Sequence, residues 1–190
     1  AVGASNDRTL LTGANLDVDI DLIGATNTIT GDFIGAGESG SDDLKISQTG
    51  STNTTAINVG ASAATDDVKI LETRVGSSGA TTYTIGNAAT VQDVSVTVDV
   101  VGDDIDITLV ENSSSTGSDK TTDIDIATDS DDVDIAVTHT GAGAHKTKLL
   151  CTGSCAGSDF TMSQTGANST DVDLTVTNAT SSDVDITITD

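Results

Sequence analysis

Aspartate is the residue type whose spacing in this sequence most readily suggests chemistry. Pairs of the form Asp-x-Asp recur along the chain, and the two-residue period of a strand puts both carboxylates of a pair on one face. Such oxygens could bind Ca²⁺ or another cation, or they could form a solvated acidic face that keeps the protein soluble. The composition favours the solvated face, and cation binding stays open as the alternative. The candidate metal ligands are Asp17, Asp19, Asp171, Asp173, Asp183 and Asp185.

Paired carboxylates also serve glycoside hydrolysis, and histidines serve acid–base catalysis. The expected carboxylates point outward and are repeated, and with no Trp, one Tyr and two Phe the chain offers no aromatic platform for a sugar. His139 and His145 have no Ser or Cys nucleophile at a recognisable spacing. We therefore expect no enzymatic activity, and no cofactor other than cations on the acidic rows. We expect a structural role for both histidines, with His139 at a strand end and His145 in a turn.

The two cysteines, Cys151 and Cys155, enclose only Thr152-Gly153-Ser154. A disulfide between them would close a very short loop and contribute roughly 2 kcal/mol at most. In an exported chain such a pair is more often a disulfide than a redox site. A metal site would need further ligands, and only His145 is near in sequence. The sequence predicts the disulfide, with free thiols or a metal site as the alternative.

The overall charge limits the possible partners. Lys and Arg number 7 against 30 Asp and Glu, which gives a formal net charge of −23 at pH 7. So acidic a chain repels nucleic acid phosphates, which argues against a DNA or RNA partner. No run of about 18 apolar residues exists, so we expect no membrane span. The chain begins at Ala1 without a signal peptide, as a mature exported protein or a shortened chain would.

The elements that must position these residues are short strands. A unit of Asp, an apolar residue, any residue and a second apolar residue recurs roughly every 12 residues, and two units make roughly 24. Turn formers rich in Gly and Ser lie between the units, and the fixed period favours a solenoid over a sandwich or a barrel. We predict an all-β, open-ended β-solenoid of about seven two-strand rungs with cross-β-like stacking. Residues 16–190 would form one domain, and residues 1–15 an N-terminal arm or partial first strand.

The alternation also predicts which side chains fill the core of each rung. We expect the inward positions to hold only Val, Ile, Leu or small residues that are interchangeable from copy to copy. The units match less well at residues 76–83 and 111–122, where we expect bulging loops. The predicted inward residues are Val18, Ile20, Leu44, Ile46, Val68, Ile70, Val94, Val96, Val172, Leu174, Val184 and Ile186.

Three units extend into a longer match, at residues 43–59, 134–141 and 159–176. They resemble the curlin repeat of bacterial curli fibre subunits, in which Gln follows the alternating strand, then Gly, then Asn at the turn. The resemblance implies a secreted β-solenoid that assembles into surface fibres. Inward amides would then form hydrogen-bonded ladders along the fibre axis, although ordinary turn polarity explains them equally well. The matched polar positions are Gln48, Gly50, Asn53, His139, Gly141, Gln164 and Gly166.

Two hypotheses of function follow. The first is a subunit of an extracellular, cell-surface filament that polymerises by head-to-tail stacking of its solenoid edges, with itself as partner and a nucleator or secretion machinery as further partners. The second is a monomeric secreted module that binds ice or carbohydrate, which would need a flat Thr array. The strand pattern reaches both ends of the repeat region, which favours the filament. The expected polymerisation edges are Val18, Ile20 and Leu22 at one end and Val184, Ile186 and Ile188 at the other.

Overall fold

The computed structural model describes residues 2–9, 17–33, 42–60, 65–86, 91–112, 120–126, 132–152, 155–166, 169–178 and 180–189. These residues form strands and no helix, and none of them belongs to a helix that could cross a membrane. The strands are β1 (Val2–Thr9), β2 (Asp17–Phe33), β3 (Asp42–Thr49), β4 (Thr52–Val59), β5 (Thr65–Val75), β6 (Ser78–Ile85), β7 (Val91–Val101), β8 (Ile105–Asn112), β9 (Lys120–Ile126), β10 (Val133–Thr140), β11 (Ala144–Cys151), β12 (Asp159–Thr165), β13 (Ser169–Val176) and β14 (Asp183–Thr189).

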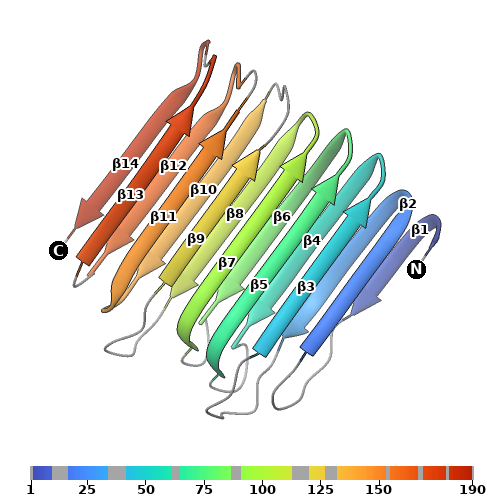
Figure 1. Ribbon diagram of the computed structural model, residues 1–190, viewed down its shortest axis with the longest axis horizontal. Coiled ribbons are helices and arrows are strands. Elements are labelled where there is room, and N and C mark those ends of the chain that lie inside the picture. The colour runs from blue at the N-terminus through green and yellow to red at the C-terminus, as the bar shows by residue number, and fades with distance from the viewer. Residues whose placement is uncertain are drawn as a thin grey trace.

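The strands are arranged in two layers, and within each layer every strand pairs in parallel with its neighbours. The odd layer runs from the first half of β2 through β3, β5, β7, β9 and β11 to β13. The even layer runs from β1 through the second half of β2, then β4, β6, β8, β10 and β12, to β14. Figure 1 shows the odd layer in front of the even layer, with the core between them. The molecule is therefore an all-β solenoid, as the alternation predicted.

A coil of this solenoid consists of one odd strand and the next even strand. The coils β3–β4, β5–β6, β7–β8, β9–β10 and β11–β12 have a neighbouring coil on both sides, so five coils are fully enclosed. The count therefore differs from the expected seven equivalent rungs. At one end, the single long strand β2 serves both layers, and at the other β13–β14 has a neighbour on one side only. Register partners are 26 residues apart at Asn27–Asn53, 28 at Ile105–Val133, 25 at Asp134–Asp159 and 24 at Asp159–Asp183, where roughly 24 was expected.

The core follows the predicted alternation, because the apolar residues of each unit occupy every second position of a strand. Burying each Val, Leu or Ile contributes roughly 1.5–3 kcal/mol, and the β-branched Val and Ile suit strands. The residues that were expected to point inward differ in how exposed they are, and their exposure rises toward the two ends of the stack. Leu44, Ile46, Val68, Ile70, Val94 and Val96 are buried, Val18, Ile20, Val172 and Leu174 are half-buried, and Val184 and Ile186 are 45% and 42% exposed.

Two sequence-based expectations about the core were wrong. Residues 76–83 were expected to bulge as a loop, but most of them belong to strand β6, in which Thr81 and Tyr83 point inward and are buried. The apolar motif missed this strand because its inward positions are Gly79, Thr81 and Tyr83. The core was also expected to hold only Val, Ile, Leu or small residues, yet it includes charged side chains. The second expected loop, at 111–122, lies largely outside the described residues.

Candidate functional site

The C-terminal end of the solenoid is an open edge. Strand β14 pairs with β12 on one side, and β13 pairs with β11 on one side. Val184, Ile186 and Ile188 continue the inward positions of Phe160, Met162 and Gln164, yet they are 45%, 42% and 49% exposed. Their exposure arises because, among the described residues, no further strand packs on the other side of β14. Val172, Leu174 and Val176 of β13 are half-buried for the same reason.

The N-terminal end is open in one layer only. Residues Asp17–Leu22 of β2 pair with β3 on one side, and Ile23 pairs with both β3 and β1. In the even layer β1 pairs with β2, from Val2 opposite Ile23 to Thr9 opposite Thr30. Val18 and Ile20 are half-buried at the open part of this edge, and Leu22 is already buried. The residues expected to form the two polymerisation edges therefore do lie at the two ends of the stack.

The outer face of the odd layer combines acids with lysines. Lys45 Nζ lies 3.7 Å from Asp19 Oδ2, and Lys146 Nζ lies 3.7 Å from Asp171 Oδ2. These two pairs are exposed and contribute little to stability. Lys148 donates to Asp123 at 3.1 Å, which raises the pKa of Lys148. Lysines thus neutralise part of the acidic row that the sequence suggested.

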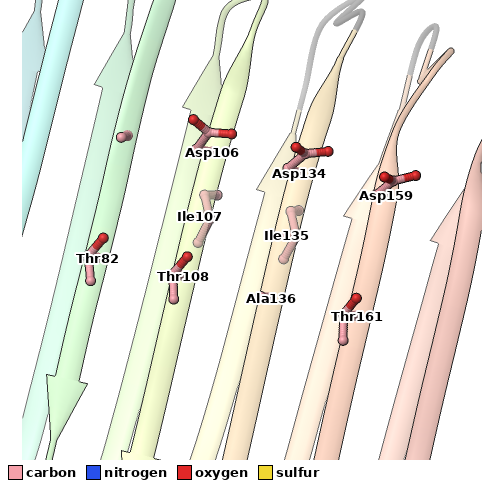
Figure 2. A pocket seen from close by; sticks show the side chains of 10 residues that line it. Thr82, Asp106, Ile107, Thr108, Asp134, Ile135, Ala136, Asp159 and Thr161 are labelled. Carbon is pink, nitrogen blue, oxygen red and sulfur yellow. The ribbon is translucent and has the colours of Figure 1, made fainter.

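The outer face of the even layer lacks this compensation among its described residues. Asp106, Asp134, Asp159 and Asp183 are neighbours in register on β8, β10, β12 and β14. Figure 2 shows three of these carboxylates in line. They line a pocket of about 490 Å³ together with Thr82, Thr108 and Thr161. Partial loss of solvent raises the pKa of Asp134, and the charges of Asp159, Asp106 and Asp132 raise it further.

The candidate metal ligands are divided between these surfaces. Asp17 and Asp19 lie on β2, Asp171 and Asp173 on β13, and Asp183 and Asp185 on β14, all exposed. Within the described part of the chain, no group of three or more His, Cys, Asp or Glu side chains is arranged to hold a metal ion. The acidic rows are therefore a charged surface rather than a preformed metal centre in this structure.

An amide ladder exists, but it is built from Asn rather than Gln. Asn27 Nδ2 donates to Asn53 Oδ1 at 2.8 Å and to the Thr49 carbonyl oxygen at 3.0 Å. In the same way, Asn53 Nδ2 donates to the Val75 carbonyl oxygen at 3.0 Å, and both Asn side chains are buried. A Cβ atom on Gly50 would clash with the carbonyl oxygen of Gly24, so the turn beside the ladder requires glycine. Asn27 lies outside the units of Asp, apolar, any and apolar residue, which is why sequence reasoning missed it.

The two matched glutamines are buried in different layers and cannot stack on each other. Gln48 lies on β3 of the odd layer, where its register neighbours are Leu22 and Arg74. Gln164 lies on β12 of the even layer beside His139, and its Nε2 donates to Thr147 Oγ1 at 2.9 Å. The remaining matched residues Gly141 and Gly166 are at turns with φ values of 104° and 77°, which favour glycine.

A first buried polar cluster surrounds Glu72. Its Oε1 accepts hydrogen bonds from Thr55 at 2.8 Å and Thr81 at 3.1 Å, and its Oε2 accepts one from Tyr83 at 2.8 Å. Arg74, two residues along the same strand, donates to Thr81 at 2.8 Å. Burial lowers the pKa of the Arg74 guanidinium, and the Glu72 carboxylate opposes this change. Burial, followed by the Glu72 charge, raises the pKa of Tyr83 well above its usual value.

A second buried cluster joins both histidines to an acid and a lysine. Thr122 Oγ1 lies 3.0 Å from His139 Nε2 and 3.4 Å from Glu111 Oε1. Lys120 Nζ lies 3.4 Å from His145 Nε2, and the two imidazole rings meet edge to face at 5.5 Å. His145 was expected in a turn, but it is a buried residue of β11. Glu111 and His139 are 0% exposed, so no dissolved ligand contacts them in this structure.

Cys151 and Cys155 are joined by a disulfide, with their Cα atoms 6.5 Å apart. Both are buried, and the bridge lies where β11 ends before the turn into β12. Hydrogen bonds from Thr177 and Ser182 to the carbonyl oxygens of Cys151 and Cys155 connect the bridged turn to the last coil. The disulfide therefore supports the coil on which the C-terminal edge rests.

The charged core residues could have been found from the phase of the alternation. Glu72 and Arg74 follow Ile70 at steps of two, and Lys120 precedes Thr122 and Ile124 at the same steps. The signal was present, but the general rule that Lys, Arg and Glu are almost never fully buried outweighed it.

Comparisons of the chain with protein-family models, with curated proteins and with solved structures found no match. The inference of function therefore rests on the geometry of the edges, the outer faces and the buried clusters.

Proposed function

We propose that this chain is the structural subunit of an extracellular protein filament and that it polymerises by adding coils end to end. The observation that carries the proposal is the pair of open edges. Val184, Ile186 and Ile188 present 42–49% exposed apolar side chains at core positions, and Val18 and Ile20 lie half-buried at the opposite end, on the outermost described strand of the odd layer. Stacking one end on the other would bury these residues and satisfy the backbone groups of both edges.

The shape of the contact explains why it would produce fibres. The two ends are different surfaces, so an end-to-end contact is heterologous and does not close on itself. Each added copy presents a new C-terminal edge, and growth continues. A role as a curlin-like functional amyloid at the cell surface, in adhesion or a biofilm matrix, fits such a filament and the resemblance of the repeat. We infer a structural rather than a catalytic role, with the chain itself as principal partner.

A monomeric binding module is the second candidate. Thr82, Thr108 and Thr161 line the pocket on the outer face of the even layer, as a surface that binds ice or carbohydrate would require. The array is interrupted, because Ala136 lies between Thr108 and Thr161 and three aspartates run beside it. A Thr array of this kind does not explain the exposed apolar edge of β14, so the filament remains the better account.

The test is the substitution Ile186→Asp, which puts a charge on an edge side chain that is 42% exposed in the single chain. We expect the unsubstituted protein to form filaments by negative-stain electron microscopy and sedimentation. The variant should keep its β-sheet circular dichroism and remain monomeric. The control is Thr82→Asp, which adds the same charge at an exposed outward position of β6, away from both ends, and should polymerise. Monodisperse protein at every concentration and salt would exclude the filament and favour the binding module.

A further inference from the structure

The two layers of the solenoid contain unequal numbers of strands, and this inequality determines how copies could stack. Strand β1 adds one strand to the even layer, and the described residues that precede β2 supply no matching strand to the odd layer. Among the described residues, the outermost strands at the N-terminal end are therefore β1 in the even layer and Asp17–Leu22 of β2 in the odd layer. At the C-terminal end they are β14 and β13.

Stacking two copies without rotation creates a conflict. Unrotated stacking would place β13 of one copy against Asp17–Leu22 of the next. The same translation would place β14 against the second half of β2. The register of the even layer runs from Thr28 through Asp106, Asp134 and Asp159 to Asp183, so β14 would occupy the edge of β2 that begins at Thr28. Residues 28–30 of that edge are already paired with residues 7–9 of β1. Without rotation, β1 must leave.

A half-turn about the long axis of the solenoid removes the conflict. Figure 1 shows the arrows of the two layers pointing in opposite directions, so a half-turn exchanges the layers and restores the strand direction. Strand β14 then meets Asp17–Leu22 of the next copy in parallel, and β13 meets β1. Both edges at each end gain a partner, and no strand is displaced.

We propose that successive copies in the filament are related by a half-turn, with β14 of one copy docked on Asp17–Leu22 of the next. This inference rests on the proposed filament function and names the surface and orientation of the partner, a second copy of the chain. The side chains fit this docking in sequence order. Asp183-Val184-Asp185-Ile186 meets Asp17-Val18-Asp19-Ile20, and Ile188 meets Leu22. The inward positions of Phe160 and Met162 then continue through Val184 and Ile186 into Val18 and Ile20 of the next copy.

The proposal is tested by cysteine pairs at exposed outward positions of the full chain. In the half-turn filament Thr187 faces Asp21 of the next copy, and in the unrotated filament Thr175 faces Asp21 instead, because the odd-layer register connects Asp21 to Thr175. Facing residues of paired strands lie about 4.8 Å apart, within the range of a disulfide, whereas residues in different layers lie about 10 Å apart or more. The variants are Asp21→Cys/Thr187→Cys and, as the matched control, Asp21→Cys/Thr175→Cys.

Filaments of both variants are oxidised mildly and separated on a non-reducing denaturing gel. We expect the Asp21→Cys/Thr187→Cys variant to give a ladder of covalent multimers with at least about tenfold more cross-linked protein than the control. A ladder from the Thr175 pair instead, or filaments with neither pair cross-linked, overturns the half-turn while leaving the filament function intact. Failure of the unsubstituted chain to form filaments overturns the filament function, and the half-turn with it.

Discussion

Glu111 and His139 lie on neighbouring strands of the even layer with Glu111 Oε2 3.3 Å from His139 Nε2, and both side chains are fully buried. Burial raises the pKa of Glu111 to about 8, although Lys120 and the hydrogen bond from Thr122 oppose the change. Burial, followed by the charges of His145 and Lys120, lowers the pKa of His139 to about 3. Near neutral pH the contact therefore joins a protonated carboxyl to a neutral imidazole rather than two ions.

This pair predicts a stability maximum in weakly acidic solution. The raised pKa of Glu111 contributes stability that is fully present below the unfolded pKa near 4.5 and is lost as the pH rises through about 8. The lowered pKa of His139 contributes in the opposite sense, because folding resists protonation, so stability is lost as the pH falls from about 6.5 to about 3. The free energy of unfolding should decline on both sides by on the order of a few kcal/mol. Denaturant titrations between pH 3 and 9 would measure this.

Substitutions separate the loss of stability at alkaline pH (the alkaline arm) from the loss at acidic pH (the acidic arm). Glu111→Gln should flatten the alkaline arm, and His139→Gln should flatten the acidic arm, since each removes one titrating group. Asp173→Asn, a control on the exposed face of β13, should leave both arms in place. A Glu111→Gln protein that still loses stability between pH 6 and 8 would contradict the assignment.

Tyr83→Phe should destabilise the fold by about 1–3 kcal/mol. The substitution keeps the ring in the core but removes the hydroxyl that donates to Glu72 Oε2 at 2.8 Å, which leaves a buried acceptor without that bond. Combining it with Glu72→Gln in a double-mutant cycle isolates the interaction. Additive losses in urea unfolding would show that the hydroxyl and the carboxylate do not interact.

Asn53→Ala should cost about 2 kcal/mol, because the ladder amide bonds the Val75 carbonyl and accepts from Asn27 inside the protein. Asn58→Ala is the matched control on the same strand, since Asn58 is exposed and its bond to Asp32 lies in solvent. That change should stay within about 0.5 kcal/mol. Equal losses in thermal or urea unfolding would mean that burial of the amide is unimportant.

Assembly should respond to salt through the carboxylates at the junction. In the half-turn filament, the row Asp134, Asp159, Asp183 meets Asp17 and Asp43 of the next copy. Each pair of facing carboxylates repels by roughly 1 kcal/mol in water, and salt screens it. Polymerisation should therefore be slower in low salt with chelator, and Asp183→Asn should accelerate it several-fold. The control Asp99→Asn removes the same charge far from the ends, and equal acceleration by both would argue against a junction effect.

Removing residues 1–9 should change the orientation between copies. Without β1 the two layers contain equal numbers of strands, and β14 gains access to the edge of β2 that begins at Thr28. Unrotated stacking then pairs both edges. In the shortened chain the cross-link should move from the Asp21→Cys/Thr187→Cys pair to the Asp21→Cys/Thr175→Cys pair. Circular dichroism would verify that the β-solenoid remains, and an unchanged cross-link would show that β1 does not set the orientation.

The sequence predicted the solenoid because its signal is local. In units such as Asp43-Leu44-Lys45-Ile46, alternate positions are apolar, and the structure buries Leu44 and Ile46. The polar clusters were not predicted, since the placement of Glu72 depends on Thr55, Thr81 and Tyr83, which come from two other strands. The sequence also did not predict which layer holds the outermost strand at each end. That depends on the pairing of β1 with β2, and residues 1–15 lack the repeat motif.

The buried charges also bear on how a repetitive chain avoids folding errors. If all coils were interchangeable, a strand could skip to the wrong neighbour and still bury Val against Ile, and nothing in the core would reject the mistake. Glu72 finds its three hydroxyl donors only when β4, β5 and β6 are in their own order. A slipped chain would enclose an uncompensated carboxylate at a cost of several kcal/mol. Each buried polar cluster thus favours one order of the strands, and the core of this protein disfavours slipped arrangements of its own repeats.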